Sequence, residues 1–108
     1  MKIPKSVRIG GIEYTVNHTQ DLVVGNQLCY GYICFDDSTI QILSNHDMGV
    51  QRQGVTLWHE ILHGIREHSG MVIENEEEIV EMFSKGIYQV LQDNGRRFFD
   101  IVSDTDAS

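Results

Sequence analysis

The sequence lacks several features that would each point to a class of protein. No apolar run in its 108 residues approaches the roughly 20 that a membrane-spanning helix needs. No apolar stretch follows the N-terminal residues 1–5, so we expect no secretory signal. Eight Lys and Arg stand against 16 Asp and Glu, a net charge of −8. This balance argues against binding to nucleic acid or to an anionic membrane, because both require clustered positive charge.

Cysteine is equally scarce. Cys29 and Cys34 are the only two, and two lone thiols in a chain without an export signal are expected to stay reduced. The length matches one domain. We therefore expect an acidic, cytoplasmic protein with a single domain over residues 1–108, and the sequence does not specify its oligomeric state.

The first half, residues 1–50, is predicted to be rich in strands. Alternating apolar and polar residues predict strands over 6–9, 12–16, 30–35 and 39–43. Gly10-Gly11 forms a hairpin signal between the first two. The polar stretch 17–28 predicts a connection with one helical turn around its apolar residues 22–24.

Residues 51–94 predict two helices. The first covers about 51–68 and ends before Gly70, a glycine typical of helix C-termini. The second is expected to begin at Asn75 as N-cap, to form a capping box with Glu78 and to end near Asp93, leaving 95–108 as a polar tail. The fold class is α+β, with an antiparallel or mixed sheet of about four strands packed on two helices.

The segment His59-Glu60-Ile61-Leu62-His63 lies on the first predicted helix. The two histidines are about 40° apart on a narrow polar face, and the opposite face is apolar. Two imidazoles one turn apart can bind a single Zn²⁺. Glu60 is rotated by about 100° from His59, which favours contact with a water over contact with the metal. The alternative interpretation is a surface helix with two solvated histidines.

A third ligand is expected from the acidic residues around the start of the second helix, which are Glu74, Glu76, Glu77, Glu78 and Glu81. Glu77 borders the apolar stripe of that helix and is our choice, with Glu76 as the alternative. Glu81 lies one turn further, where it can accept a hydrogen bond from the second ring nitrogen of a ligating histidine. Favourable interaction with the helix dipole is the ordinary explanation of such acids. Two imidazoles and a carboxylate suit several divalent metals.

The HExxH segment together with Glu77-Glu78-Ile79-Val80-Glu81 resembles the pattern of gluzincin metallopeptidases, with Glu81 where these often carry Asp or Asn. More specifically, the chain is similar to short HExxH proteins of phages and prophages of Gram-positive bacteria, relatives of the ImmA/IrrE metallo-endopeptidases. The likeness covers residues 3–11, 56–63 and 86–94, and nothing in the chain corresponds to the additional C-terminal domain of larger members.

The resemblance implies a minimal zincin-like fold in which His59, His63 and Glu77 hold Zn²⁺. It implies that a zinc-activated water attacks a peptide carbonyl with Glu60 as general base. The substrate would be a protein or peptide, a repressor among the candidates, in the cytoplasm of a bacterial host. We expect it to add a strand to a sheet edge, and residues 30–35 are our choice for that edge.

Two other interpretations remain open. One is a catalytically weak or inactive zincin-like module that binds a partner protein, which the small size favours and the intact Glu60 disfavours. The other is a latent enzyme in which an aspartate of the tail (Asp100, Asp104 or Asp106) occupies the open metal position. Structural roles are expected for His18, Tyr30, His46 and Tyr88.

Overall fold

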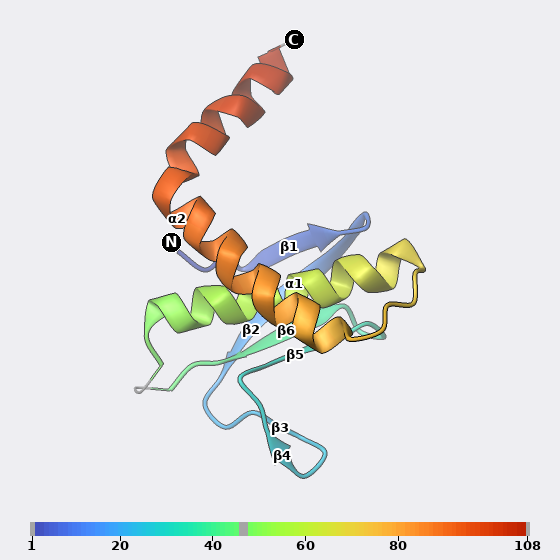
Figure 1. Cartoon of the computed structure of the whole chain (residues 1–108). Coiled ribbons are helices and arrows are strands. Elements are labelled where there is room, and N and C mark those ends of the chain that lie inside the picture. The colour runs from blue at the N-terminus through green and yellow to red at the C-terminus, as the bar shows by residue number, and fades with distance from the viewer. Residues whose placement is uncertain (1, 46–47, 108) are drawn as a thin grey trace.

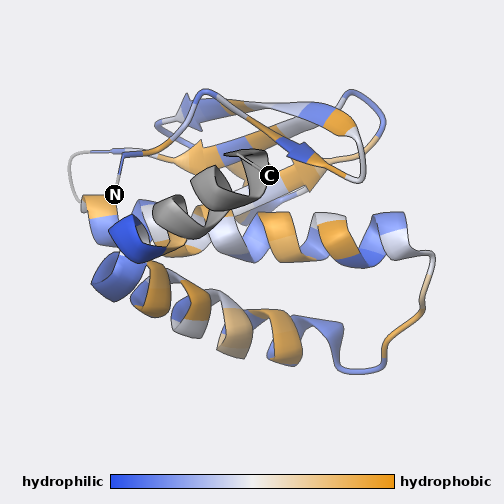
Figure 2. Cartoon of the chain, turned by 90° about the horizontal axis from the view of Figure 1, so that it is seen from above, coloured by the Kyte–Doolittle hydropathy of each residue, from blue (hydrophilic) through white to orange (hydrophobic). Residues whose placement is uncertain are grey.

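The computed structural model describes residues 2–45 and 48–107, with side chains described up to residue 98 (Figure 1). A four-stranded sheet packs on α1 (Val50–Ser69), and α2 (Glu76–Ala107) lies on the other side of α1. The result is three layers, with α1 between the sheet and the first turns of α2 (Figure 2). The predicted α+β class is confirmed.

The main sheet contains the four predicted strands, in the order β1-β2-β6-β5. Their bounds are Ser6–Ile9 for β1, Ile12–Thr19 for β2, Gly31–Cys34 for β5 and Thr39–Leu43 for β6. β2 pairs with β6 in parallel and the other pairs are antiparallel, so the sheet is mixed. The order leaves β5 at an edge of the sheet, as predicted for residues 30–35.

A small hairpin replaces the helical turn that we predicted around residues 22–24. β3 (Val23–Val24) pairs with β4 (Gln27–Leu28) in a separate two-stranded sheet. The two valines are β-branched and favour extended backbone, and Gly25, with φ of 66°, allows the chain to reverse. The predicted helical turn was wrong because the positive φ of Gly25 reverses the chain and lets the residues on either side of it pair as strands.

The core lies between the sheet and the apolar face of α1. Its buried members are Ile9, Tyr14, Val16, Ile33, Ile40, Ile42, Leu57 and Ile61. Gly64 lets α1 approach the sheet closely, because a Cβ at this position would lie 3.0 Å from Ile9 Cδ1. Gly70 adopts the left-handed conformation, with φ of 74°, and ends α1 as predicted. Burial of the apolar face turns the opposite polar face of α1 toward α2 and β5.

The second helix begins directly after Asn75, as predicted, but its predicted capping interaction and its predicted end need correction. Asn75 has φ of 61° instead of the extended backbone of an N-cap, and no capping hydrogen bond from Asn75 or Glu78 is present among the described residues. The helix also continues past Asp93 to Ala107, through the predicted tail. Asn94 donates from Nδ2 to the carbonyl oxygen of Val90 at 3.0 Å, and Gly95 does not take the left-handed conformation that would end the helix. Neither helix, as far as the structure describes them, is long and apolar enough to cross a bilayer.

Candidate metal centre

His59 and His63 lie on adjacent turns of α1 and point to the same side. Their Nε2 atoms are 3.2 Å apart and their ring centroids 4.9 Å apart. Both side chains are largely buried, with 16% and 19% of their surface exposed. Leu57 and Ile61, on the opposite face, are buried in the core and hold the helix in this rotation. The face predicted for the two histidines is therefore confirmed.

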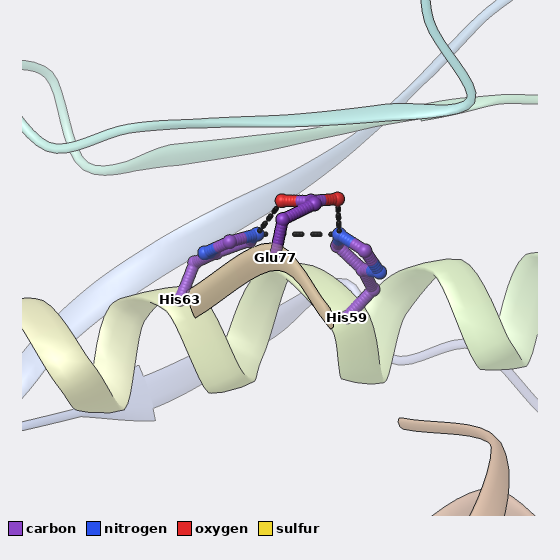
Figure 3. Close-up of side chains that lie close together, drawn as sticks. All are labelled: His59, His63 and Glu77. Atoms are coloured by element: carbon purple, nitrogen blue, oxygen red, sulfur yellow. Dashed lines mark hydrogen bonds and ion pairs between the residues drawn. The ribbon is translucent and has the colours of Figure 1, made fainter. Parts of the chain in front are cut away.

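Glu77, in the first turn of α2, joins both histidines (Figure 3). Its Oε1 is 2.8 Å from Nε2 of His59 and its Oε2 is 3.0 Å from Nε2 of His63. One ligand atom from each of the three residues lies within 4.8 Å of the others. Two ligands of a tetrahedral Zn²⁺ are about 3.3 Å apart at Zn–N distances of 2.0–2.1 Å. The three side chains thus form a group that could hold a metal ion.

The second nitrogen of each imidazole faces another carboxylate. His59 Nδ1 is 3.1 Å from Glu81 Oε2, the contact that we predicted for Glu81, and His63 Nδ1 is 2.7 Å from Glu76 Oε2. A carboxylate at Nδ1 keeps the proton on that nitrogen, which leaves the Nε2 lone pair free for a metal. Both rings are therefore oriented by carboxylates at Nδ1 with their Nε2 atoms turned toward each other and toward Glu77.

Glu76, our alternative third ligand, supports His63 from behind. Its second oxygen is 2.8 Å from Nε of Arg66, so the residue is held between an imidazole and a guanidinium. The hydrogen bond from His63 and the charge of Arg66 keep the pKa of Glu76 below its usual range. Sequence reasoning missed this role, although Arg66 lies one turn after His63 on the same face of α1.

Glu60 lies beside this group and is almost fully buried, with 7% of its surface exposed. Burial raises its pKa to about 7, an effect that His63 opposes and Glu77 reinforces. A Cβ on Gly31 would lie 2.8 Å from Glu60 Oε2 and 2.6 Å from Thr56 Cγ2, so the carboxylate packs directly on the backbone of β5. In the described part of the chain, no group donates a hydrogen bond to this carboxylate.

A cavity of about 330 Å³ lies between β5 and the two helices, and all of these groups except Thr56 and Glu81 line it. We call it the histidine cavity. It is lined by Gly31, Tyr32, Ile33, Phe35, His59, Glu60, His63, Arg66, Glu76 and Glu77. The edge strand thus forms one wall of the cavity, and the acidic start of α2 forms another.

Other residues singled out in the sequence have structural contacts. Tyr88 is buried and its ring packs on Gly54, and His18 Nδ1 is 2.6 Å from Ser44 Oγ. His68, outside the group, has its Nε2 2.8 Å from the hydroxyl of the buried Tyr14. Both cysteines are free. His46 and the side chains of Asp100, Asp104 and Asp106 lie outside the described residues.

No protein-family model, curated protein or solved structure matches this chain. The metal-binding interpretation therefore depends on the geometry of His59, His63 and Glu77 alone.

Proposed function

We propose that the protein is a gluzincin-type, zinc-dependent metallopeptidase that hydrolyses peptide bonds of a specific protein substrate. The observation that carries this proposal is the convergence of three metal-ligand side chains beside a buried glutamate, in a cavity walled by an edge strand. His59, His63 and Glu77 would hold the metal, and Glu60 would act as general base.

The donor set supports a catalytic site over a structural one. Structural zinc sites are usually closed by four ligands that include cysteine, whereas catalytic sites combine three protein ligands with an open position. The group here has two imidazoles and one carboxylate, and neither cysteine belongs to it. A bound Zn²⁺ would polarise the substrate carbonyl and acidify a water.

Glu60 is suited to accept and return a proton. Its carboxylate is fixed against Gly31 and Thr56, and within the described residues it accepts no hydrogen bond that would occupy its lone pairs. It shares the histidine cavity with the proposed ligands without belonging to the group. In the proposed reaction Glu60 takes the proton of the attacking water and passes it to the leaving amine.

The edge strand β5 supports a peptide substrate. No strand of the described residues pairs with β5 on the side away from β6, so an extended peptide can add to the sheet there. Such a peptide would lie along the wall of the histidine cavity and present a backbone carbonyl to it. A repressor protein is the substrate that the sequence resemblance favours.

A protein-binding module with weak or no activity is the second candidate. The exposure of Glu77, whose side chain is 71% accessible, favours it, because a site open to solvent holds a peptide less firmly. Metal content together with peptide hydrolysis separates the two, because a binding module can hold zinc without cleaving a peptide.

Elemental analysis of the purified protein tests the proposal. We expect one zinc per chain in the wild type, lost in Glu77→Ala and kept in Glu60→Gln, with peptide hydrolysis lost in both variants. Glu78→Ala is the matched control, because Glu78 is exposed in the same turn and does not belong to the group. Absence of zinc from the wild type after reconstitution would contradict the peptidase and favour the binding module.

A further inference from the structure

A second and larger cavity, of about 670 Å³, adjoins the histidine cavity. We call it the Arg52 cavity. It is lined by Tyr30, Gly49, Gln51, Arg52, Val55, Thr56, Glu81 and Lys85. Tyr30 immediately precedes Gly31, which lines the histidine cavity, and Glu81 contacts His59. The two cavities therefore follow one another along the start of β5.

The Arg52 cavity holds two cations in a chain of net charge −8. The Arg52 guanidinium lies over the Tyr30 ring, 5.1 Å from its centroid, and no carboxylate pairs with it among the described residues. Lys85 Nζ is 3.2 Å from Glu81 Oε1. Arg52 is thus held in place by an aromatic face while its hydrogen-bond donors stay available to an anion.

The spacing along α1 relates this cation to the proposed reaction centre. Arg52, Thr56, His59 and His63 are separated by four, three and four residues, so they share one face of the helix. The seven residues from Arg52 to His59 correspond to about 10 Å along the helix axis. An extended peptide covers that length in about three residues.

We propose that the Arg52 cavity is a substrate subsite for a carboxylate, carried by an acidic side chain or by the C-terminus of the peptide about three residues from the bond that is cut. A guanidinium binds a carboxylate through two parallel hydrogen bonds, which gives both attraction and orientation. Lys85 offsets the negative charge of Glu81, with which it pairs, so the positive charge of Arg52 remains for an anion. This inference rests on the proposed function, since it takes the peptide to lie along β5.

Binding of short peptides to the full-length Glu60→Gln variant, with zinc supplied, tests the subsite. Three fluorescent pools of random heptapeptides would be compared, free of other acidic residues. The first pool has a central Glu and an amidated C-terminus. The second has a central Gln and an amidated C-terminus, and the third has a central Gln and a free C-terminal carboxylate. We expect the first or the third pool to bind about tenfold more tightly than the second. Whichever pool binds more tightly identifies the source of the carboxylate.

Arg52→Gln, added to the Glu60→Gln variant, should remove the preference for peptides that carry a carboxylate. Lys85→Gln in the same background should reduce that preference. Arg96→Gln is the matched control, because Arg96 is exposed and lies about 16 Å further along α2 than Lys85. Circular dichroism would verify that each variant is folded. Equal binding of all pools, or a preference that survives Arg52→Gln, would overturn the subsite.

Hydrolysis of the same pools by the wild type, followed by mass spectrometry, separates this inference from the proposed function. A preference for a carboxylate without any cleavage would overturn the peptidase and leave the anion site standing. Cleavage at positions unrelated to a carboxylate would overturn the subsite and leave the peptidase standing.

Discussion

Glu60, the proposed general base, illustrates how a buried carboxylate can oppose stability at the scale of one residue. Its carboxylate is removed from water, and burial raises its pKa from the ordinary 4.5 to about 7. The folded state therefore binds more protons than the unfolded state between these two pH values. The contribution of Glu60 to the free energy of unfolding is therefore most favourable below pH 4.5, its pKa in the unfolded state. This contribution is lost as the pH rises through about 7, its pKa in the folded state.

We expect Glu60→Gln to stabilise the metal-free protein at pH 8, by up to about 3 kcal/mol. Glutamine has nearly the same shape but carries no charge to bury. The advantage should shrink as the pH falls and disappear below pH 4.5, where Glu60 becomes protonated in both states. Urea unfolding at several pH values in the presence of a chelator measures this difference. A difference in unfolding free energy between Glu60→Gln and the wild type that is equal at pH 8 and pH 4.5 would contradict this prediction. The variant of an exposed residue, Glu78→Gln, should show no such dependence on pH.

At the residue scale, the helical period placed both histidines and favoured Glu77 as the third residue of the group, with Glu76 left as the alternative. The wheel of α1 predicted the common face of His59 and His63, because burial of the opposite face fixes the rotation. The contact of Glu76 with His63 was not predictable in the same way. It depends on how residues 70–75 return the chain from α1 to α2, and the left-handed Asn75 in that loop has no reliable sequence signal.

At the scale of elements, two helical glycines should respond to alanine in opposite ways. A Cβ at Gly64 would lie 3.0 Å from Ile9 Cδ1 and 3.2 Å from Ile33 Cδ1, whereas one at Gly86 would meet nothing within 4 Å. Gly64→Ala should therefore lower the free energy of unfolding by about 1–3 kcal/mol through overpacking. Gly86→Ala should raise it by about 0.5–1 kcal/mol, because alanine favours the helix. Thermal unfolding of the two variants measures this, and a Gly64→Ala variant as stable as the wild type would contradict the role assigned to Gly64.

The same elements show where sequence patterns are decisive. Strands 6–9 and 39–43 were predicted with their observed bounds because alternation and turn residues agreed. The end of α2 was misplaced because a glycine costs a helix only about 1 kcal/mol, which good helix formers on both sides can offset. Asn94-Gly95 is a strong stop only where the glycine takes the left-handed conformation, and here it does not.

At the scale of the whole molecule, the proposed centre joins two layers of the fold. α1 supplies the two histidines and α2 supplies Glu77, so a bound metal would connect the layers directly. Glu60, Glu76, Glu77 and Glu81 surround the same two imidazoles. In the metal-free protein these acids repel one another, and a divalent ion would offset much of that repulsion.

Zinc should therefore raise the thermal stability of the entire chain. A ligand whose free concentration is 100 times its dissociation constant stabilises the folded state by about 2.7 kcal/mol. For a domain of this size, that free energy corresponds to a rise of about 10–15 °C in Tm. The shift should be smaller at 1 M salt, because salt screens both the repulsion between the acids and the attraction to the ion. Differential scanning calorimetry with and without zinc measures it. Glu77→Ala should lose the shift and Glu78→Ala should keep it, and an equal shift in both would place the ion elsewhere in the molecule.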